Sequence, residues 1–287
     1  MCRLLGYCAR DRASLAELMT EPGLRHFSAL SQWHGDGWGV AWYDDQQMLV
    51  EKSPGRAIDE PAYDKLTHCA LGDAGLVHLR MATPGLPVEA CNTHPFTRDG
   101  FALAHNGAIH PQDRLGELLP PEWDERRTGV TDSERYFLHV MSMLERSGGD
   151  VVAALSATID HIDSKFTANS LNAILLGPDA LYAICCYHPD RIPVEGLAVR
   201  GYKGAPERYF DLAYRVTDGA VVVASSGWPQ DGWTFVPNRH VLVLERGTLD
   251  IRIEPLAAGT PSIEVLRKML VVTAPPARDA ARAAVTV

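Results

Sequence analysis

The chain begins with MCRLLGY at residues 1–7, which places a cysteine directly after the initiator methionine. Methionine aminopeptidases remove Met1 when a small residue follows it, so we expect Cys2 to become the first residue of the mature chain. That residue carries a thiol, whose thiolate form is the reactive nucleophile, and an α-amine with a pKa of about 7.7–8.0. One residue can therefore supply both a nucleophile and its general base, which makes Cys2 the first candidate catalytic residue.

The composition excludes several classes of protein. At 287 residues, the chain is long enough for one large domain or two small ones. It carries 36 acidic and 27 basic side chains, and the net charge of −9 argues against nucleic acid as a partner. No apolar run reaches the length of a membrane span, and no secretory signal is visible. The sequence therefore predicts a cytoplasmic protein that does not bind a membrane.

The cysteines form neither a metal-binding nor a disulfide pattern. There are six of them, no two are spaced as C-x-x-C, and Cys185 and Cys186 are adjacent within an apolar stretch. Zinc ligands typically come in such spaced pairs, and disulfide frameworks belong to secreted chains. We therefore predict a reduced protein with no metal and no cofactor.

Hydrophobic patterns predict many short strands, with helices near the start and in the middle of the chain. We expect strands at 4–8, 40–43, 48–52, 76–80, 101–105, 171–176, 181–187, 220–224, 241–245 and 249–253. We expect helices at 14–19, from Thr131 to the stop at Ser147-Gly148-Gly149, and at 150–162. Two sheets with helices packed outside them satisfy this order, which is an α+β layered domain. Residues 275–287 are rich in Pro, Ala and Arg, and we expect a flexible tail there.

Two further segments contain candidate functional residues. Residues 34–42 (HGDGWGVAW) are rich in glycine, which allows unusual backbone geometry, and we expect a loop that packs beside Cys2. Residues 79–85 place Arg80 at a strand end, before a Thr-Pro-Gly turn. Its planar guanidinium can bind a carboxylate in a bidentate way, although a lone arginine is more often a surface residue.

Residues 104–108 (AHNGA) follow the polar segment 92–96 (NTHPF) and allow two interpretations. Asn-Gly between apolar segments is typical of a hairpin turn. The alternative is an oxyanion hole, in which the Asn106 side-chain amide and the Gly107 backbone N–H point at a developing negative oxygen. The residues alone leave both interpretations open.

The segment Thr131-Asp132-Ser133-Glu134 has the pattern of a capping box, with threonine at the helix N-cap and glutamate three residues later. Asp132 falls in the first helical turn, where the helix dipole favours a carboxylate. Such a carboxylate can also bind a substrate ammonium group, although the motif alone is usually only a cap.

The order of these motifs along the chain resembles that of the class II glutamine amidotransferases. These are glutaminase domains of the N-terminal nucleophile hydrolase fold. The motifs cover roughly residues 2–150, and the later strands fit the rest of such a domain more loosely. The resemblance implies one domain at 2–274. Its fold would be a four-layer αββα sandwich of two antiparallel sheets flanked by helices.

The resemblance also implies a mechanism. Cys2 attacks the γ-carboxamide of glutamine, and its own amine moves the proton. Asn106 and Gly107 stabilise the tetrahedral oxyanion. Ammonia then leaves, and water hydrolyses the γ-glutamyl thioester.

Four residues would bind the amino-acid end of the substrate. Arg80 binds the α-carboxylate, with assistance from Thr83 and His94. Asp132 binds the α-ammonium group. A zwitterionic amino acid needs one cation and one anion, so Arg80 and Asp132 suit it on electrostatic grounds as well.

Departures from the larger members of the family bear on the substrate. Met81 stands where the sugar-phosphate amidotransferases carry tryptophan, which places the chain nearer the small standalone members. Residues 82–88 and 105–107 resemble the ergothioneine-pathway member, which cleaves a larger γ-glutamyl amide. Residues 92–96 look more like the generic standalone amidotransferases.

Three hypotheses about function remain open at this point. The first is a glutaminase that delivers ammonia to a separate synthetase partner, because no acceptor domain is visible in the sequence. The second is a γ-glutamyl amidohydrolase that acts on a modified small metabolite and needs no partner. The third is a non-catalytic interaction protein on the same fold.

Overall fold

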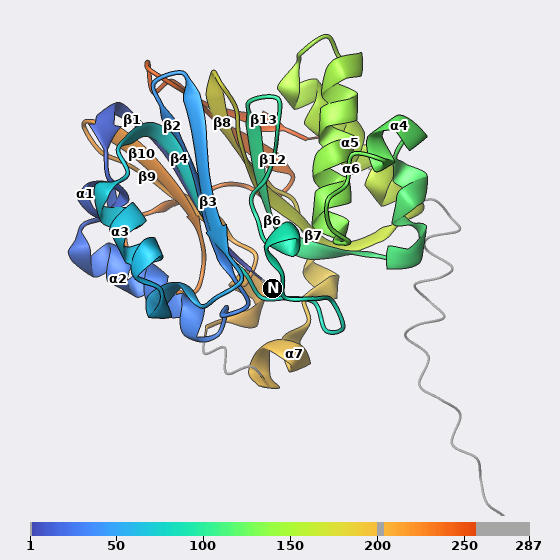
Figure 1. Cartoon of the computed structure of the whole chain (residues 1–287), viewed down its shortest axis with the longest axis horizontal. Coiled ribbons are helices and arrows are strands. Elements are labelled where there is room, and N and C mark those ends of the chain that lie inside the picture. The colour runs from blue at the N-terminus through green and yellow to red at the C-terminus, as the bar shows by residue number, and fades with distance from the viewer. Residues whose placement is uncertain (1, 200–203, 257–287) are drawn as a thin grey trace, which may run out of the picture.

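The computed structural model describes residues 2–199 and 204–256, which form two antiparallel sheets with helices on their outer faces (Figure 1). The tail predicted at 275–287 and the end of the domain predicted at 2–274 lie outside these residues. Within the described part of the chain, no helix is both long and apolar enough to cross a bilayer.

The first sheet contains the strand that starts directly after Cys2. Its order is β11-β9-β10-β1-β4-β2-β3. The strands are β1 (Arg3–Ala13), β2 (Trp38–Asp44), β3 (Gln47–Ser53), β4 (Gly72–Leu79), β9 (Leu212–Val216), β10 (Ala220–Ser225) and β11 (Thr234–Phe235). Because β1 lies between β10 and β4, both of its edges are hydrogen-bonded, and this holds the N-terminal segment in place.

The second sheet has the order β13-β12-β8-β7-β6-β5. Its strands are β5 (Phe96–Arg98), β6 (Phe101–His110), β7 (Thr167–Leu176), β8 (Ala180–Cys185), β12 (His240–Glu245) and β13 (Ile251–Pro255). The long strands β6 and β7 pair along almost their whole length. The Asn-Gly segment of β6 lies within this pairing.

Helices cover the outer face of each sheet, so the molecule has four layers (Figure 1). The first sheet is covered by α1 (Leu15–Met19), α2 (Glu21–Ala29) and α3 (Pro61–Cys69). The second is covered by α4 (Pro121–Asp124), α5 (Asp132–Arg146) and α6 (Val151–Lys165). A short helix, α7 (Val194–Val199), follows β8. The predicted αββα arrangement is thus the observed one.

Both faces of β1 are apolar because successive side chains pack into two different hydrophobic cores. Leu4 and Cys8 belong to the core between the two sheets, whereas Leu5 and Tyr7 belong to the core beneath α1–α3. A strand that is buried on both faces is apolar on both, so its sequence does not alternate between apolar and polar residues. At Gly6 a Cβ would lie 2.8 Å from a Leu181 methyl carbon, so a glycine at this position lets the two sheets approach closely.

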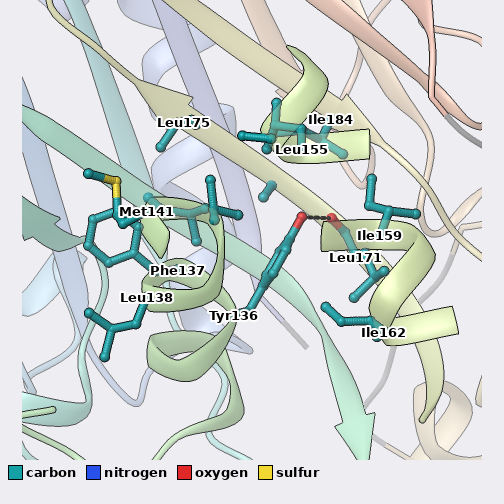
Figure 2. Packing of buried hydrophobic residues seen from close by; sticks show 14 of the residues in the cluster. Tyr136, Phe137, Leu138, Met141, Leu155, Ile159, Ile162, Leu171, Leu175 and Ile184 are labelled. Atoms are coloured by element: carbon teal, nitrogen blue, oxygen red, sulfur yellow. Dashed lines mark hydrogen bonds between the residues drawn. The ribbon is translucent and has the colours of Figure 1, made fainter. Parts of the chain in front are cut away.

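The helices α5 and α6 pack on the second sheet through the largest hydrophobic cluster (Figure 2). Phe137, Met141 and Leu155 are buried there against strand residues such as Leu175. The buried Tyr136 donates its hydroxyl hydrogen to the Leu171 carbonyl oxygen at 3.3 Å, which satisfies the only polar atom of that side chain. This packing fixes α5, and with it Asp132, relative to β6 and β7.

The structure corrects the sequence predictions in several places. The Asn106-Gly107 pair does not form a hairpin turn, because it pairs with β7 inside the long strand β6. The strands β5 and β11 were not predicted because two or three residues are too few to show a period. The strand β9 and the helices α2, α3, α4 and α7 were also missed.

The capping box at α5 is only half formed. The Glu134 N–H donates to Thr131 Oγ1 at 3.1 Å, as predicted. The Glu134 carboxylate, however, accepts from the backbone N–H groups of Thr128 and Gly129 instead of from the N-cap residue. The glutamate therefore holds the segment that precedes the helix.

Candidate active site

Cys2 lies at the start of β1, against the chain that leaves β4. The Met81 N–H donates to Cys2 Sγ at 3.4 Å, and the side chain is almost fully buried. Burial raises the pKa of the Cys2 thiol, while the Arg80 charge lowers it and the Asp132 charge raises it. The thiol is therefore protonated at neutral pH and needs a nearby base to become a nucleophile. The charges of the Arg80 and Asp132 side chains thus both act on this sulfur.

Arg80 is held by backbone oxygens rather than by a carboxylate. Its Nη1 donates to the Asp36 carbonyl oxygen and its Nη2 to the Pro87 carbonyl oxygen, each at 3.2 Å. In the described part of the chain, no acidic side chain lies within ion-pair distance of it. The guanidinium is thus oriented while its charge stays available to an incoming anion.

The glycine-rich loop at residues 34–42, which was predicted to lie near Cys2, is hydrogen-bonded to residues 80–82 after β4. Arg80 N–H donates to the Gly37 carbonyl oxygen at 2.8 Å, and Asp36 N–H donates to the Arg80 carbonyl oxygen at 3.1 Å. Asp36 Oδ2 accepts from the Ala82 N–H at 2.8 Å. Asp36 therefore fixes the backbone on both sides of Met81, a contact that no local sequence pattern indicated.

Thr83 begins the tight turn that follows Arg80. The Leu86 N–H donates to the Thr83 carbonyl oxygen at 3.1 Å, and Gly85 has a φ of +88°, which favours glycine. Thr83 is partly exposed at this turn. The structure thus places Thr83 three residues beyond Arg80, on the same short connection.

Asn106 is a buried polar residue of the second sheet. It is fully buried on β6, and neither polar atom of its side-chain amide has a hydrogen-bond partner among the described residues. Asn172, its partner on the neighbouring strand β7, has both amide atoms bonded: Nδ2 donates to the Phe210 carbonyl oxygen and Oδ1 accepts from the Cys186 N–H. Leaving a buried amide unpaired costs about 1–3 kcal/mol, so Asn106 calls for an explanation other than folding.

Gly107 is required by the close approach of β7. A Cβ at this position would lie 1.9 Å from the Ser170 carbonyl oxygen and 2.7 Å from His105 Nε2. No other residue fits there without moving the strand. The backbone beside Asn106 is therefore rigid, which suits a site that must hold its donors in place.

Asp132 joins α5 to β6 and lies in the first turn of the helix. Its Oδ2 accepts from the Ile109 N–H and its Oδ1 from the Ser133 N–H, both at 2.9 Å. The side chain is buried. Among the described residues Oδ2 has this one partner, so its second lone pair can still accept from an ammonium. Asp132 therefore binds the strand of Asn106, and its charge also acts on the Cys2 thiol.

His94 belongs to a buried cluster of histidines that the sequence did not indicate. Its ring lies 4.1 Å from that of His78 and 4.8 Å from that of Phe96, measured between centroids. None of the four ring nitrogens of His78 and His94 has a hydrogen-bond partner among the described residues. Burial lowers the pKa of both, to about 3 for His78 and well below the usual range for His94. Both rings are therefore neutral at pH 7.

His105, next to Asn106, is also neutral and has a defined tautomer. Its Nε2–H donates to the Ser170 carbonyl oxygen at 3.1 Å, and its Nδ1 pairs with Ser133 Oγ at 2.9 Å. Burial lowers its pKa, against the opposing effect of Asp132. These bonds tie β6 to the first turn of α5, on the side of Asp132.

We expect stability to fall as the pH drops below about 6.5. The folded-state pKa of His78 is depressed to about 3, so between these values the unfolded chain binds a proton that the folded chain does not. Each such histidine should remove about 1.4 kcal/mol from the free energy of unfolding per pH unit. Urea unfolding of wild type and His78→Gln at pH 7.5, 5.5 and 4.5 measures the slope.

The slope should be shallower in His78→Gln, because one buried proton acceptor is lost. His26→Gln serves as the matched control, since His26 is exposed, and its slope should equal that of the wild type. Equal slopes in all three proteins would show that His78 does not account for acid sensitivity.

Among the described residues, no group of three or more His, Cys, Asp or Glu side chains is arranged to hold a metal ion. A buried thiol, an oriented cation, an anion and an unpaired amide form a set that can bind a zwitterion and support nucleophilic attack.

The fold and the site define a class of enzyme with a cysteine nucleophile at the N-terminus, in a two-sheet sandwich flanked by helices. The family model of the class II glutamine amidotransferases matches residues 1–259. The chain belongs to this family, as its motifs suggested.

Two curated relatives match over most of their length. The γ-glutamyl-hercynylcysteine sulfoxide hydrolase of Mycobacterium tuberculosis is 29% identical over 259 residues, which cover 86% of this chain and 94% of the relative. The protein of the same name from Mycolicibacterium smegmatis is 26% identical and covers 84% of this chain and 95% of its own.

Solved structures confirm the N-terminal nucleophile hydrolase fold. A glutamine aminotransferase class-II domain protein from Silicibacter pomeroyi has a TM-score of 0.59 at 19% identity, covering 90% of this chain and all of the other. The glutamine phosphoribosylpyrophosphate amidotransferase of B. subtilis has a TM-score of 0.58 at 15% identity, covering 90% of this chain but 50% of the other.

Proposed function

We propose that this protein hydrolyses the γ-amide of glutamine or of a larger γ-glutamyl amide through a thioester on Cys2. One observation carries the proposal: the buried Cys2 thiol accepts from the N–H of Met81, which directly follows the buried cation Arg80, and the buried anion Asp132 also acts on this thiol. The γ-glutamyl group has a carboxylate and an ammonium at the end remote from its amide. A site with both charges beside a nucleophile suits a γ-glutamyl amide better than an amide that lacks these charged groups.

In the proposed first step, the Cys2 α-amine accepts the thiol proton once Met1 has been removed. The thiolate attacks the γ-carbonyl carbon, a C–S bond forms, and the carbonyl oxygen becomes an oxyanion. The Asn106 side-chain amide and the Gly107 N–H donate to that oxyanion, which would give the unpaired amide of Asn106 its partner.

Collapse of the tetrahedral intermediate breaks the C–N bond. The Cys2 ammonium returns its proton to the nitrogen, so ammonia or an amine leaves. Water then attacks the γ-glutamyl thioester, with the amine again as base, and glutamate is released with the free thiol restored. Arg80, with Thr83 and His94 beside it, would hold the α-carboxylate, and Asp132 the α-ammonium.

Glutamate release from L-glutamine and from a panel of γ-glutamyl amides tests the proposal. The protein should have its Met1 removal confirmed by intact mass. Steady turnover of L-glutamine would support a glutaminase, whose ammonia could go to a synthetase partner. Release of glutamate from no compound, with or without cell extract, would exclude this function and favour a non-catalytic role.

A larger γ-glutamyl amide is the second candidate substrate. It is favoured by the two relatives named as γ-glutamyl-hercynylcysteine sulfoxide hydrolases, which the chain covers almost completely. The panel separates the two cases, because turnover of a γ-glutamyl thioether or sulfoxide with little turnover of L-glutamine would select this one.

We expect Arg80→Lys to raise KM for L-glutamine about 10–100-fold while kcat changes much less. The charge is retained, but the planar fork that can bind a carboxylate through two N–H groups is lost, and bonds to charged groups contribute about 1.5–3 kcal/mol. Steady-state kinetics of the two proteins measure the effect. An unchanged KM would show that Arg80 does not bind the carboxylate.

A further inference from the structure

Asn92, in the NTHPF segment, is a buried polar residue whose side chain contacts the backbone of two separate parts of the site. It lies in a short helical turn (Ala90–Asn92), and its side chain is almost fully buried. Oδ1 accepts from the Val130 N–H at 2.9 Å, and Nδ2 donates to the Pro87 carbonyl oxygen at 3.4 Å. The proposed mechanism gives this residue no role.

The contact with Pro87 connects Asn92 to Arg80, the cation of the site. The same Pro87 carbonyl oxygen accepts from Arg80 Nη2 at 3.2 Å, so one oxygen receives both Asn92 and Arg80. Pro87 lies on the exposed connection after the turn at Gly85. Asn92 therefore steadies the oxygen that orients the guanidinium.

The contact with Val130 connects Asn92 to the segment that precedes Asp132, the anion of the site. Val130 is two residues before Asp132, directly ahead of the Thr131 N-cap. Glu134 binds the Thr128 and Gly129 N–H groups, and Asn92 binds the next one, so three consecutive N–H groups are engaged by side chains.

Gly129 shows how tightly the two segments are packed. A Cβ at Gly129 would lie 2.4 Å from Asn92 Oδ1 and 2.8 Å from the Cys91 carbonyl oxygen. A side chain at position 129 would force the two segments apart, and the nearest atom that it would meet belongs to Asn92.

We propose that Asn92 is a positioning residue that sets the spacing between Arg80 and Asp132, and thereby makes the site selective for the α-amino-acid end of a γ-glutamyl substrate. Its two amide atoms form the bridge between the backbone oxygen that orients the cation and the backbone that precedes the anion. The inference rests on the proposed function, because it takes Arg80 and Asp132 as the two substrate anchors.

The test compares wild type, Asn92→Ala and Asn92→Asp as full-length chains with Met1 removed. Asn92→Ala breaks both contacts and should raise KM for L-glutamine at least about tenfold, with kcat within about threefold. Asn92→Asp keeps an acceptor for Val130 but loses the donor to Pro87, so its KM should be intermediate.

Two reagents separate positioning from general damage. Inactivation by 6-diazo-5-oxo-L-norleucine, which carries the zwitterionic end, should slow in both variants. Alkylation of Cys2 by iodoacetamide, which lacks that end, should keep its wild-type rate. The preference for L-glutamine over 4-carbamoylbutanoate, which has no α-ammonium group, should also fall.

Asn238→Ala is the matched control. Asn238 also bridges backbone groups with both ends of its amide, through the Tyr187 N–H and carbonyl oxygen. Asn238→Ala should lower the melting temperature about as much as Asn92→Ala does, and should leave KM and the substrate preference unchanged.

The outcomes are distinguishable. If wild type neither turns over L-glutamine or another γ-glutamyl amide nor reacts with the diazo reagent, the proposed function fails. If wild type does so but Asn92→Ala keeps its KM and its preference, or if iodoacetamide slows equally, Asn92 does not set the spacing.

Discussion

Replacement of Cys2 by alanine is expected to lower kcat for glutamate release by at least about 10⁴-fold, because the chain then has no nucleophile. Binding need not change to the same extent, since Arg80 and Asp132 remain. Glutamate release under single-turnover and steady-state conditions measures the loss. Intact mass spectrometry of wild type after rapid acid quench should show the γ-glutamyl thioester, and the variant should show none.

Cys8→Ala is the matched control on the same strand. Cys8 is fully buried between the sheets, and burial raises the pKa of its thiol to about 12, so it is not a nucleophile. The change should cost about 1–2 kcal/mol of stability through lost packing and leave kcat within about threefold. A Cys2→Ala protein with more than about a hundredth of wild-type activity would contradict the assignment of the nucleophile.

Retention of Met1 should have the same effect as loss of the thiol. The Cys2 nitrogen would then be part of a peptide bond, which cannot accept a proton, and the thiol has a raised pKa from burial. Protein expressed with the methionine aminopeptidase inhibited tests this directly. An active Met1-retaining form would show that another group serves as the base.

We expect Asn106→Ala to lower kcat about 10²–10³-fold with little change in KM, because the lost donor acts on charge that develops only in the transition state. Its free energy of unfolding should change by less than about 1 kcal/mol. The packing lost with the side chain is offset by removal of a buried amide that has no partner in the described structure.

Asn172→Ala should show the opposite pattern. Its amide is fully bonded, so its loss leaves the Cys186 N–H and the Phe210 carbonyl oxygen unpaired and should cost about 2 kcal/mol or more. Per folded molecule its kcat should stay near that of wild type. If Asn106→Ala loses stability and keeps kcat, the amide is structural and the oxyanion assignment is wrong.

Most of the regular structure followed from local patterns. Alternating residues predicted the long strands, and the Thr131 side chain caps α5 as expected. The shortest elements, such as β5 and β11, were missed because they carry no period and exist only through pairing with a neighbour. The hairpin interpretation of the Asn-Gly pair is excluded, since the pair lies inside β6 and β7 approaches it closely through the Ser170 carbonyl oxygen.

The sequence by itself determined the nucleophile candidate, the layered α+β arrangement and the motif order that places the chain in its family. Each depends on short local patterns and on their order along the chain. Tertiary structure alone decided that Met81 contacts Cys2 across 79 positions, that the Asn106 amide has no partner among the described residues, and that the Asn92 amide contacts the Pro87 and Val130 backbone. These contacts depend on strand register and loop docking, which bring remote backbone groups within about 3 Å and leave no local pattern in the sequence.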